Sequence, residues 1–216
     1  MDAQQLLNLA KTATVIPVIV IGKIDDAVPL ANALVAGGLN VLEVTLRSDA
    51  ALGAIRDIAA NVKDAHVGAG TVLDGAQWQA AALAGATFMV SPGFTENIDR
   101  VAKRGDIPWL PGVSSAADVM RARDAGYTFQ KFFPAEQAGG VPMLAAFGGP
   151  FSDIVFCPTG GIGIANAPSY LALKNVVCVG GSWVVPRNLI AAKNWQAITE
   201  LATAAQKLSH GQQVRV

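Results

Sequence analysis

A lysine in an apolar, aromatic segment is the first candidate for chemistry in this chain. Lys131 is the third residue of the segment Phe129–Ala135, whose order is Phe-Gln-Lys-Phe-Phe-Pro-Ala. Burial in such a segment removes water from the ammonium group and disfavours its charged form. The neutral amine is a nucleophile that can form a Schiff base with a carbonyl compound. The bland alternative is a stem that lies on apolar surface while its charged head reaches water.

A second set of polar residues lies within Val41–Arg47. Side chains two apart on a strand share a face, so Glu43, Thr45 and Arg47 would point away from the apolar face of the same strand. Such an inward polar set is costly unless its members are paired or functional. We expect Glu43 to transfer protons beside the lysine and Arg47 to bind a substrate carboxylate. A Glu43–Arg47 ion pair that only fills the interior is the alternative.

Two paired-glycine segments, Thr159–Ile162 and Gly180–Trp183, follow the last two expected strands. Paired glycines expose backbone N–H groups that can hold an anion, and Ser182 adds a hydroxyl. In parallel barrels, the loops after the seventh and eighth strands often bind phosphate. The two segments together therefore predict a phosphorylated ligand.

Small residues also follow three other expected strands. They form the segments Val67–Val72, Ser91–Gly93 and Pro111–Ser114, the first of which contains the hydroxyl of Thr71. Small side chains allow the backbone to approach a ligand closely, although a tight turn alone would also explain them.

Short apolar runs alternate with amphipathic segments, and their starts fall 20 to 26 residues apart. This rhythm predicts a (β/α)₈ TIM barrel rather than a doubly wound open sheet, for which no GxGxxG follows the first strand. Pro17 fits a closed barrel badly unless it begins the first strand. The expected strands are Val15–Ile21, Val41–Arg47, His66–Val72, Phe88–Ser91, Trp109–Pro111, Phe129–Pro134, Ile154–Pro158 and Val176–Val179.

Helices are expected between these strands. An extra N-terminal helix precedes the first strand, Ser48-Asp49 caps the helix after the second, and the polar residues 206–216 are frayed. We expect residues 1–216 to form one domain. The predicted helices are Asp2–Thr12, Asp25–Gly37, the segment after Ser48-Asp49, Asp74–Ala84, Ser115–Ala125 and Trp195–Leu208.

Composition excludes several classes of partner. The 16 basic and 16 acidic residues cancel and form no basic stripe, so we expect no nucleic acid partner. No apolar run is long enough to span a membrane, and the N-terminus lacks a signal peptide, which indicates a cytoplasmic protein. Apolar residues make up 52% of the chain and charged residues 15%, which suits strands buried on both faces or an oligomer.

Neither a metal nor a cofactor is expected. Cys157 and Cys178 lie in apolar runs and predict two buried thiols, while His66 and His210 belong to no ligand cluster. An imine formed at a lysine would itself withdraw electrons, so a metal would be redundant.

As an ordered set, these motifs resemble the Schiff-base aldolases that cleave 2-keto-3-deoxy-6-phosphogluconate (KDPG) or 4-hydroxy-2-oxoglutarate. The resemblance extends from the second expected strand to the eighth. One departure is Gly163-Ile164-Ala165, where the family would have a serine or threonine helix cap. The motifs are Val41–Arg47, Gly68–Val72, Ser91–Gly93, Lys131–Glu136, Pro158–Ile162 and Gly180–Trp183.

The resemblance implies a homotrimer of TIM barrels and a role for each motif. Lys131 would form the Schiff base and Glu43 would be the general acid–base. The remaining roles are Arg47 and Thr71 for the pyruvate carboxylate, Pro92 and Phe133 for the pyruvyl pocket, Thr159 for the sugar hydroxyls, and Gly160, Gly161, Gly181 and Ser182 for the phosphate.

The implied reaction is cleavage of KDPG to pyruvate and glyceraldehyde 3-phosphate in the Entner–Doudoroff pathway. Two alternatives stay open. The substrate could be 4-hydroxy-2-oxoglutarate or the galactonate epimer, since the pyruvyl half is common to all three. A barrel that binds a sugar phosphate and regulates another process would use the glycine loops but would give Lys131 and Glu43 no task.

Overall fold

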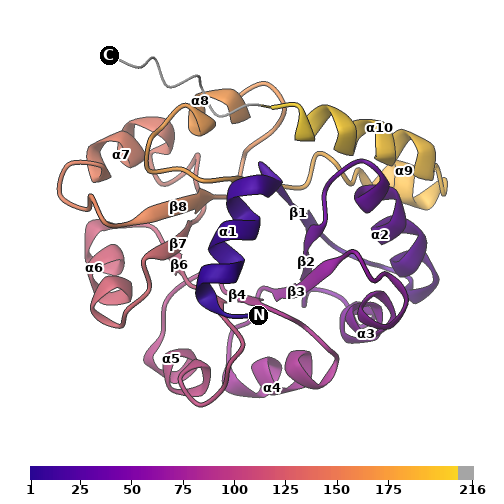
Figure 1. Ribbon diagram of the computed structural model, residues 1–216, viewed down its shortest axis with the longest axis horizontal. Coiled ribbons are helices and arrows are strands. Elements are labelled where there is room, and N and C mark those ends of the chain that lie inside the picture. The colour runs from indigo at the N-terminus through magenta and orange to yellow at the C-terminus, as the bar shows by residue number, and fades with distance from the viewer. Residues whose placement is uncertain (209–216) are drawn as a thin grey trace.

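The protein is described by a computed structural model that covers residues 1–208. Strands and helices alternate around a ring, with the strands inside and the helices outside (Figure 1). The expected (β/α)₈ barrel is confirmed. Most of the tail that we predict to be frayed, His210 included, lies outside the described residues. Gln206, which we placed in that tail, is instead the last residue of the final helix.

Parallel strands form the wall of the barrel. The larger sheet has the order β5-β4-β3-β2-β1-β9 and the smaller one the order β6-β7-β8. Their bounds are β1 (Val15–Ile19), β2 (Val41–Thr45), β3 (His66–Gly70), β4 (Met89–Val90), β5 (Trp109–Leu110), β6 (Gly112–Val113), β7 (Phe129–Phe132), β8 (Val155–Pro158) and β9 (Val179–Gly181).

Two junctions join these sheets into a closed ring. At one junction, β5 and β6 are a single strand interrupted at Pro111, whose carbonyl accepts a hydrogen bond from the Lys131 N–H. At the other, the bridges Phe156↔Val176 and Thr159↔Gly180 connect β8 to the β9 segment. The eighth strand therefore begins at Val179, three residues later than predicted.

Ten α-helices and a 3₁₀ turn, η1, occur in the described part of the chain. The expected N-terminal helix is present as α1. Asp74 and Ser115, where two of the predicted helices begin, are the N-caps of α4 and α6. The bounds are α1 (Ala3–Ala13), η1 (Ile24–Asp26), α2 (Ala27–Ala36), α3 (Ala51–Asn61), α4 (Gly75–Leu83), α5 (Glu96–Ala102), α6 (Ala116–Asp124), α7 (Gly140–Phe147), α8 (Ala167–Leu171), α9 (Arg187–Ala191) and α10 (Trp195–Gln206).

Two local predictions are wrong. Ser48-Asp49 does not cap α3, because the N-cap residue is Ala50 and the Ser48 hydroxyl donates to the Ile21 carbonyl instead. Pro17 is the middle residue of β1 rather than its first. It lies where pairing passes from β9, which is in register with residues 15–17, to β2, which is in register with residues 18–19.

Apolar side chains form two cores. The larger core packs the strands against the outer helices. The smaller core contains Leu6, Ala10 and Ala13 of α1 together with interior residues such as Phe88 and Phe129. Phe129 begins β7, so α1 closes the end of the barrel at which strands start. Figure 1 shows α1 lying across the ring at this end. The opposite end, where parallel strands carry active groups, stays clear of α1.

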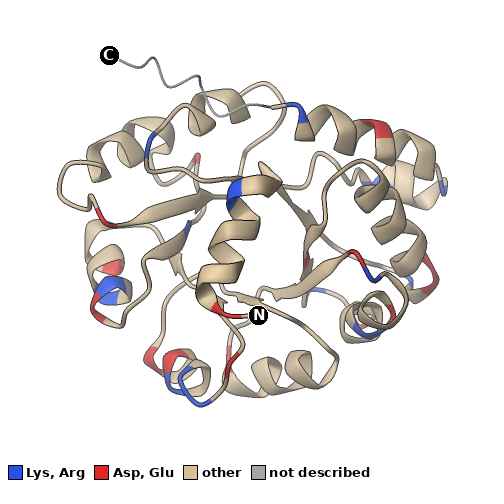
Figure 2. Cartoon of the chain, viewed as in Figure 1, with Lys and Arg blue, Asp and Glu red and all other residues tan. Residues whose placement is uncertain are grey.

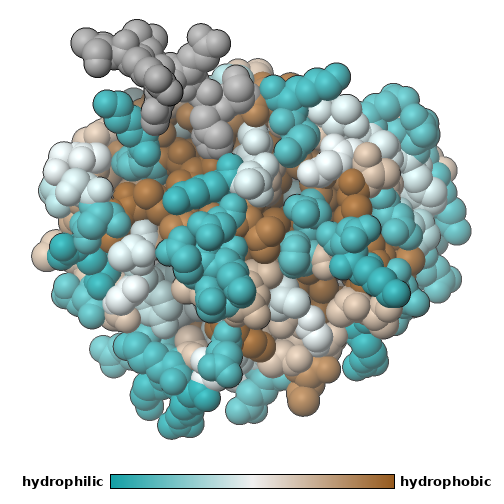
Figure 3. All heavy atoms as spheres, viewed as in Figure 1, coloured by the Kyte–Doolittle hydropathy of each residue, from teal (hydrophilic) through white to brown (hydrophobic). Residues whose placement is uncertain are grey.

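Charge is concentrated on the outer helices and loops (Figure 2). On the face that carries α1, hydrophilic and hydrophobic side chains are interspersed (Figure 3). No helix within residues 1–208 is long and apolar enough to cross a membrane.

Candidate active site

Lys131 and Glu43 meet inside the barrel. Lys131 is on β7 and Glu43 is on β2, and their exposed fractions are 5% and 3%. The Lys131 Nζ lies 3.0 Å from Glu43 Oε1 and 3.3 Å from Oε2. The carboxylate is therefore placed to accept the proton that the ammonium must lose before its nitrogen can act as a nucleophile. The predicted inward orientation of both side chains is confirmed.

Gly70 provides the space that the Glu43 carboxyl occupies. It pairs with Thr45 across β2 and β3, and a Cβ at this position would collide with the Oε1, Cγ and Cδ atoms of Glu43. The sequence suggested that glycines here would admit a ligand. The structure shows that this one admits a protein side chain.

The Phe133 ring forms another wall around the lysine. Its centroid is 5.5 Å from Lys131 Nζ, within the range of a cation–π contact. Phe133 follows β7 and is joined to Pro134 by a cis peptide bond. The ring keeps one side of the Nζ atom apolar, as the sequence predicts for a desolvated amine.

Thr45 links the exposed Arg47 to the backbone of β1. The Thr45 hydroxyl is buried, donates to the Ile19 carbonyl at 2.8 Å and accepts from Arg47 Nε at 3.2 Å. Strand β2 ends at Thr45, so Arg47 lies beyond it on the loop. This bond uses only Nε, so the two terminal nitrogens of the guanidinium do not bond to Thr45.

The loops after β3 and β4 carry the other residues predicted for the pyruvyl end. Thr71 follows β3 in a left-handed conformation, with φ of 60°, which is strained for a threonine. Pro92 follows β4 and packs so closely on Gly112 that a Cβ there would collide with the Pro92 carbonyl group. The side chains of Thr71 and Pro92 make no hydrogen bond to Arg47 or Lys131 in the structure.

The glycine loop after β8 has the open backbone that the sequence predicts. Gly160 and Gly161 have φ of 107° and 74°, which side-chain-bearing residues rarely adopt. Thr159, immediately before them, is buried, and its hydroxyl lies so close to Gly180 that no Cβ fits there. The loop after β8 is therefore in direct contact with β9.

Ser182 and Arg47 line one cavity of about 330 Å³, although they come from opposite ends of the chain. Ser182 follows β9, and Gly181 before it leaves room for the Trp183 ring. Val18, Val20, Val185, Pro186 and Arg187 complete the lining. The cavity brings the residue predicted for a carboxylate and one predicted for a phosphate to the same space.

A Glu136–Tyr170 contact supports the glycine loop and has no counterpart in the sequence predictions. The Tyr170 hydroxyl donates to Glu136 Oε1, and Glu136 N–H donates to the Gly160 carbonyl at 3.2 Å. Burial and this hydrogen bond raise the pKa of Tyr170, so the phenol stays a neutral donor. Only the position of Glu136 directly after the lysine segment could have hinted at this role.

Asn166 explains the departure at Gly163-Ile164-Ala165. Its side-chain oxygen accepts from Gly163 N–H at 2.8 Å, and its amide donates to the Gly161 carbonyl at 3.1 Å. The asparagine thus fixes the turn before α8, where the family resemblance led us to expect a serine or threonine.

The two cysteines are buried free thiols, as predicted. Burial, reinforced by the contact with Cys157, raises the pKa of Cys178 well above its usual value. Among residues 1–208, no group of three or more His, Cys, Asp or Glu side chains is arranged to hold a metal ion.

A closed parallel barrel with a buried amine beside a carboxylate defines the class of this protein as a lyase of the aldolase type. The chain belongs to the family of KDPG and KHG aldolases, whose sequence model matches residues 6–201.

Individual relatives are similar over nearly their whole length. The 2-dehydro-3-deoxy-phosphogluconate aldolase of Pseudoalteromonas atlantica is 52% identical over 191 residues, which cover 88% of this chain and 89% of the relative. The KHG/KDPG aldolase of Escherichia coli K12 is 52% identical over 198 residues, covering 92% and 93%.

A solved structure agrees with both fold and family. The KDPG aldolase of Legionella pneumophila superimposes with a TM-score of 0.90 at 47% identity, covering 92% of this chain and 97% of that one. That structure holds pyruvate captured at low pH as a covalent carbinolamine intermediate.

Proposed function

We propose that this protein cleaves KDPG to pyruvate and glyceraldehyde 3-phosphate through a Schiff base at Lys131, as a step of the Entner–Doudoroff pathway. The observation that carries the proposal is the buried contact of 3.0 Å between Lys131 Nζ and Glu43 Oε1. The carbinolamine trapped in the Legionella relative supports the same chemistry.

Lys131 begins the reaction after its ammonium proton passes to Glu43. The free Nζ adds to the C2 ketone and forms a carbinolamine, which loses water when Glu43 returns a proton to the C2 hydroxyl. The resulting iminium is electron-poor. Because it accepts the electron pair of the C3–C4 bond, that bond can break while a base takes the C4 hydroxyl proton.

The second half of the reaction restores the enzyme. Glyceraldehyde 3-phosphate leaves, and an enamine of pyruvate stays attached to Lys131. Protonation at C3 regenerates the iminium, and addition of water followed by departure of the amine releases pyruvate. Glu43 is the nearest carboxylate to Lys131 Nζ and serves these proton steps in turn, directly or through water.

The remaining predicted site residues divide between the two ends of the substrate. Arg47, held through Thr45, and Thr71 bind the pyruvate carboxylate, because a guanidinium matches the two oxygens of a carboxylate. Pro92 and Phe133 line the pyruvyl pocket, Thr159 meets the sugar hydroxyls, and the phosphate is bound by Gly160, Gly161, Gly181 and Ser182.

A second substrate, 4-hydroxy-2-oxoglutarate, is the main alternative. The Escherichia coli relative carries both substrates in its name, and the reacting pyruvyl half is shared. The galactonate epimer would also use Lys131 and Glu43 and would differ only at the far end. A purely regulatory barrel does not account for the buried ion pair.

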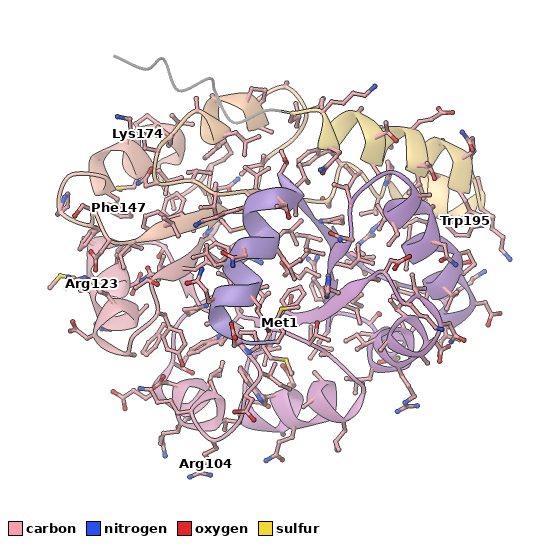
Figure 4. All side chains as sticks on the ribbon, in the orientation of Figure 1. Met1, Arg104, Arg123, Phe147, Lys174 and Trp195 are labelled. Carbon is pink, nitrogen blue, oxygen red and sulfur yellow. The ribbon has the colours of Figure 1, made fainter. Side chains whose placement is uncertain are left out.

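The test is borohydride trapping with pyruvate, read by mass spectrometry. Wild type should gain one pyruvate-sized adduct, and peptide mapping should place it on Lys131. Lys131→Met should gain none, with circular dichroism to verify folding, while the exposed-lysine control Lys174→Ala should trap like wild type (Figure 4). An adduct on another lysine, or none on folded wild type, would overturn the proposed mechanism.

We also propose that residues 1–216 form a single domain, that the protein is cytoplasmic, and that it assembles as a homotrimer. Five large apolar side chains are exposed among residues 1–208 and support assembly, among them Leu83 at 88% and Leu73 at 54%. Sedimentation equilibrium should give three times the chain mass. A monomer at micromolar concentration would contradict the trimer.

A further inference from the structure

Arg187 lines the same cavity as Arg47 and Ser182. It is the first residue of α9, on the loop that follows β9, whereas Arg47 follows β2. Arg187 has no predicted role, because it lies outside every motif that carries the family resemblance. The barrel brings these two guanidiniums to one space of about 330 Å³.

The charges around this cavity are unbalanced. The four ion pairs found among residues 1–208 involve neither Arg47 nor Arg187. No carboxylate lines the cavity, whose other residues are one serine, one proline and three valines. Two guanidiniums that share a space without a carboxylate repel each other, and an anionic ligand between them removes that repulsion.

A second, adjoining cavity adds to the positive region. Its volume is about 400 Å³, and Val20 and Arg187 belong to both linings. Lys23 and Lys193 add two ammonium groups, and Asp26 is the one carboxylate in the lining. Arg187 therefore borders both cavities, and Lys23 and Lys193 increase the positive charge on the side of Arg187 that faces the second cavity.

We propose that Arg187 is a specificity-determining residue that binds the phosphate of the substrate together with Ser182. This inference rests on the proposed function. A phosphate dianion interacts strongly with a guanidinium, whereas a neutral terminal hydroxyl gains little from it. Arg187 thus favours phosphorylated 2-keto acids over their unphosphorylated counterparts, while Arg47 holds the carboxylate at the other end.

The experiment compares two substrates that differ only in the phosphate, KDPG and 2-keto-3-deoxygluconate. Arg187→Ala should raise KM for KDPG by roughly 10- to 100-fold with little change in kcat, as expected from loss of one charged hydrogen-bonding group. Its kcat/KM for 2-keto-3-deoxygluconate should stay within twofold of wild type. Arg187→Lys should recover part of the lost preference, since it restores charge without the planar fork.

Arg104→Ala is the matched control. Arg104 is also exposed and follows α5, on the opposite side of the ring from α9 (Figure 4). It should leave both kinetic constants unchanged, which separates a local contact from a change in overall charge. Inorganic phosphate should inhibit wild type competitively and should inhibit Arg187→Ala with at least a tenfold higher Ki.

The outcomes separate this inference from the proposed function. Pyruvate trapping at Lys131 should be equal in wild type and Arg187→Ala, because the pyruvyl half does not reach the phosphate. Suppose that wild type traps pyruvate. If Arg187→Ala then loses the same factor of kcat/KM on both substrates, or keeps wild-type kcat/KM on both, the role of Arg187 is overturned and the aldolase mechanism stands. If wild type fails to trap pyruvate, the proposed function fails first.

Discussion

The Lys131–Glu43 ion pair is buried at a cost that its attraction only partly offsets, since both groups lose their water. Each is at most 5% exposed, and they lie 88 positions apart in the chain. A buried ion pair is therefore weak grounds for stability. It makes better sense as a means of keeping an amine and its proton acceptor in contact before a substrate arrives.

The position of Glu43 depends on the missing side chain at Gly70. We expect Gly70→Ala to push the carboxyl away from Lys131 Nζ, because the new Cβ would occupy the space of the Glu43 side chain. A displacement of the carboxyl by about 1 Å should lower kcat by about 10²-fold. Steady-state kinetics and a thermal melt would separate misplacement from unfolding.

Gly105→Ala is the control for this prediction. A Cβ at Gly105 would meet nothing within 4 Å, so activity and melting temperature should both stay near the wild-type values. Full activity in folded Gly70→Ala would mean that the carboxylate position is not critical.

The alternation of side chains along a strand predicted the central residues of the site. The other site residues could not be predicted, because they depend on packing between distant parts of the chain. The inward orientation of Glu43 and Lys131 follows from the two-residue alternation of side chains on their strands. Glu136, Tyr170 and Arg187 do not, because their partners come from loops whose approach no local pattern encodes. The space-making role of Gly70 likewise depends on a neighbouring strand.

Helix α6 begins with a capping box that should make its stability depend on pH. Partial burial would raise the pKa of Asp118, but hydrogen bonds from Ser115 and Ser114 outweigh it and hold that pKa below its usual value of 3.8. The closest of these bonds is 2.8 Å from Ser115 Oγ to Asp118 Oδ2. A lowered pKa means that the ionised carboxylate stabilises the folded state.

We expect Asp118→Asn to lower the free energy of unfolding by about 1 kcal/mol at pH 7. The contribution of a carboxylate with a lowered pKa is present above pH 3.8 and is lost as the pH falls through its folded-state pKa. The difference in free energy of unfolding between wild type and Asp118→Asn, measured by urea titration, should therefore become smaller below about pH 4. Asp64→Asn removes an exposed carboxylate that caps no helix and is the control. A difference in free energy of unfolding that does not change with pH would contradict the prediction.

At the element scale, helix starts were predictable where the first polar side chain is free to act as the N-cap. Asp74 and Ser115, which begin two of the predicted helices, accept from the N–H groups of Gln77 and Asp118. Ser48 has the same capping chemistry, but a distant carbonyl, that of Ile21, takes its hydroxyl. Strand ends were less predictable, since β2 and β3 each end two residues before the strand predicted from the sequence does.

The molecule separates stability at one end of the barrel from chemistry at the other. Leu6 of α1 is 2% exposed and packs into the core beneath the helix. Leu6→Ala should lower the free energy of unfolding by about 2–4 kcal/mol, because it leaves a cavity. Below the melting range, kcat and KM should be unchanged, since the lysine faces the other end.

Asn8→Ala tests the exposed side of the same helix. It should change stability by less than about 0.5 kcal/mol. If Leu6→Ala altered KM at temperatures where the protein is folded, the two ends of the barrel would not be independent.

The closure of the barrel was the part of the fold least accessible to sequence reasoning. Repeated strand–helix spacing predicted the ring, but β8 and β9 are joined only by isolated bridges and Pro17 is tolerated in mid-strand. Both details depend on where pairing changes from one neighbour to the next, which spacing along the chain does not encode.

The pairing of β1 with β9 also determines when the ring can form during synthesis. Val15 is in register with Val179, and Pro17 with Gly181. The first strand therefore cannot complete its pairing until β9, the last strand, has been synthesised. At ribosomal speeds this leaves one edge of β1 unpaired for roughly 10 to 30 s. Unpaired strand edges attract other chains. The nascent polypeptide therefore has a defined interval in which a chaperone, or another copy emerging from the same polysome, could bind that edge before its own final strand arrives.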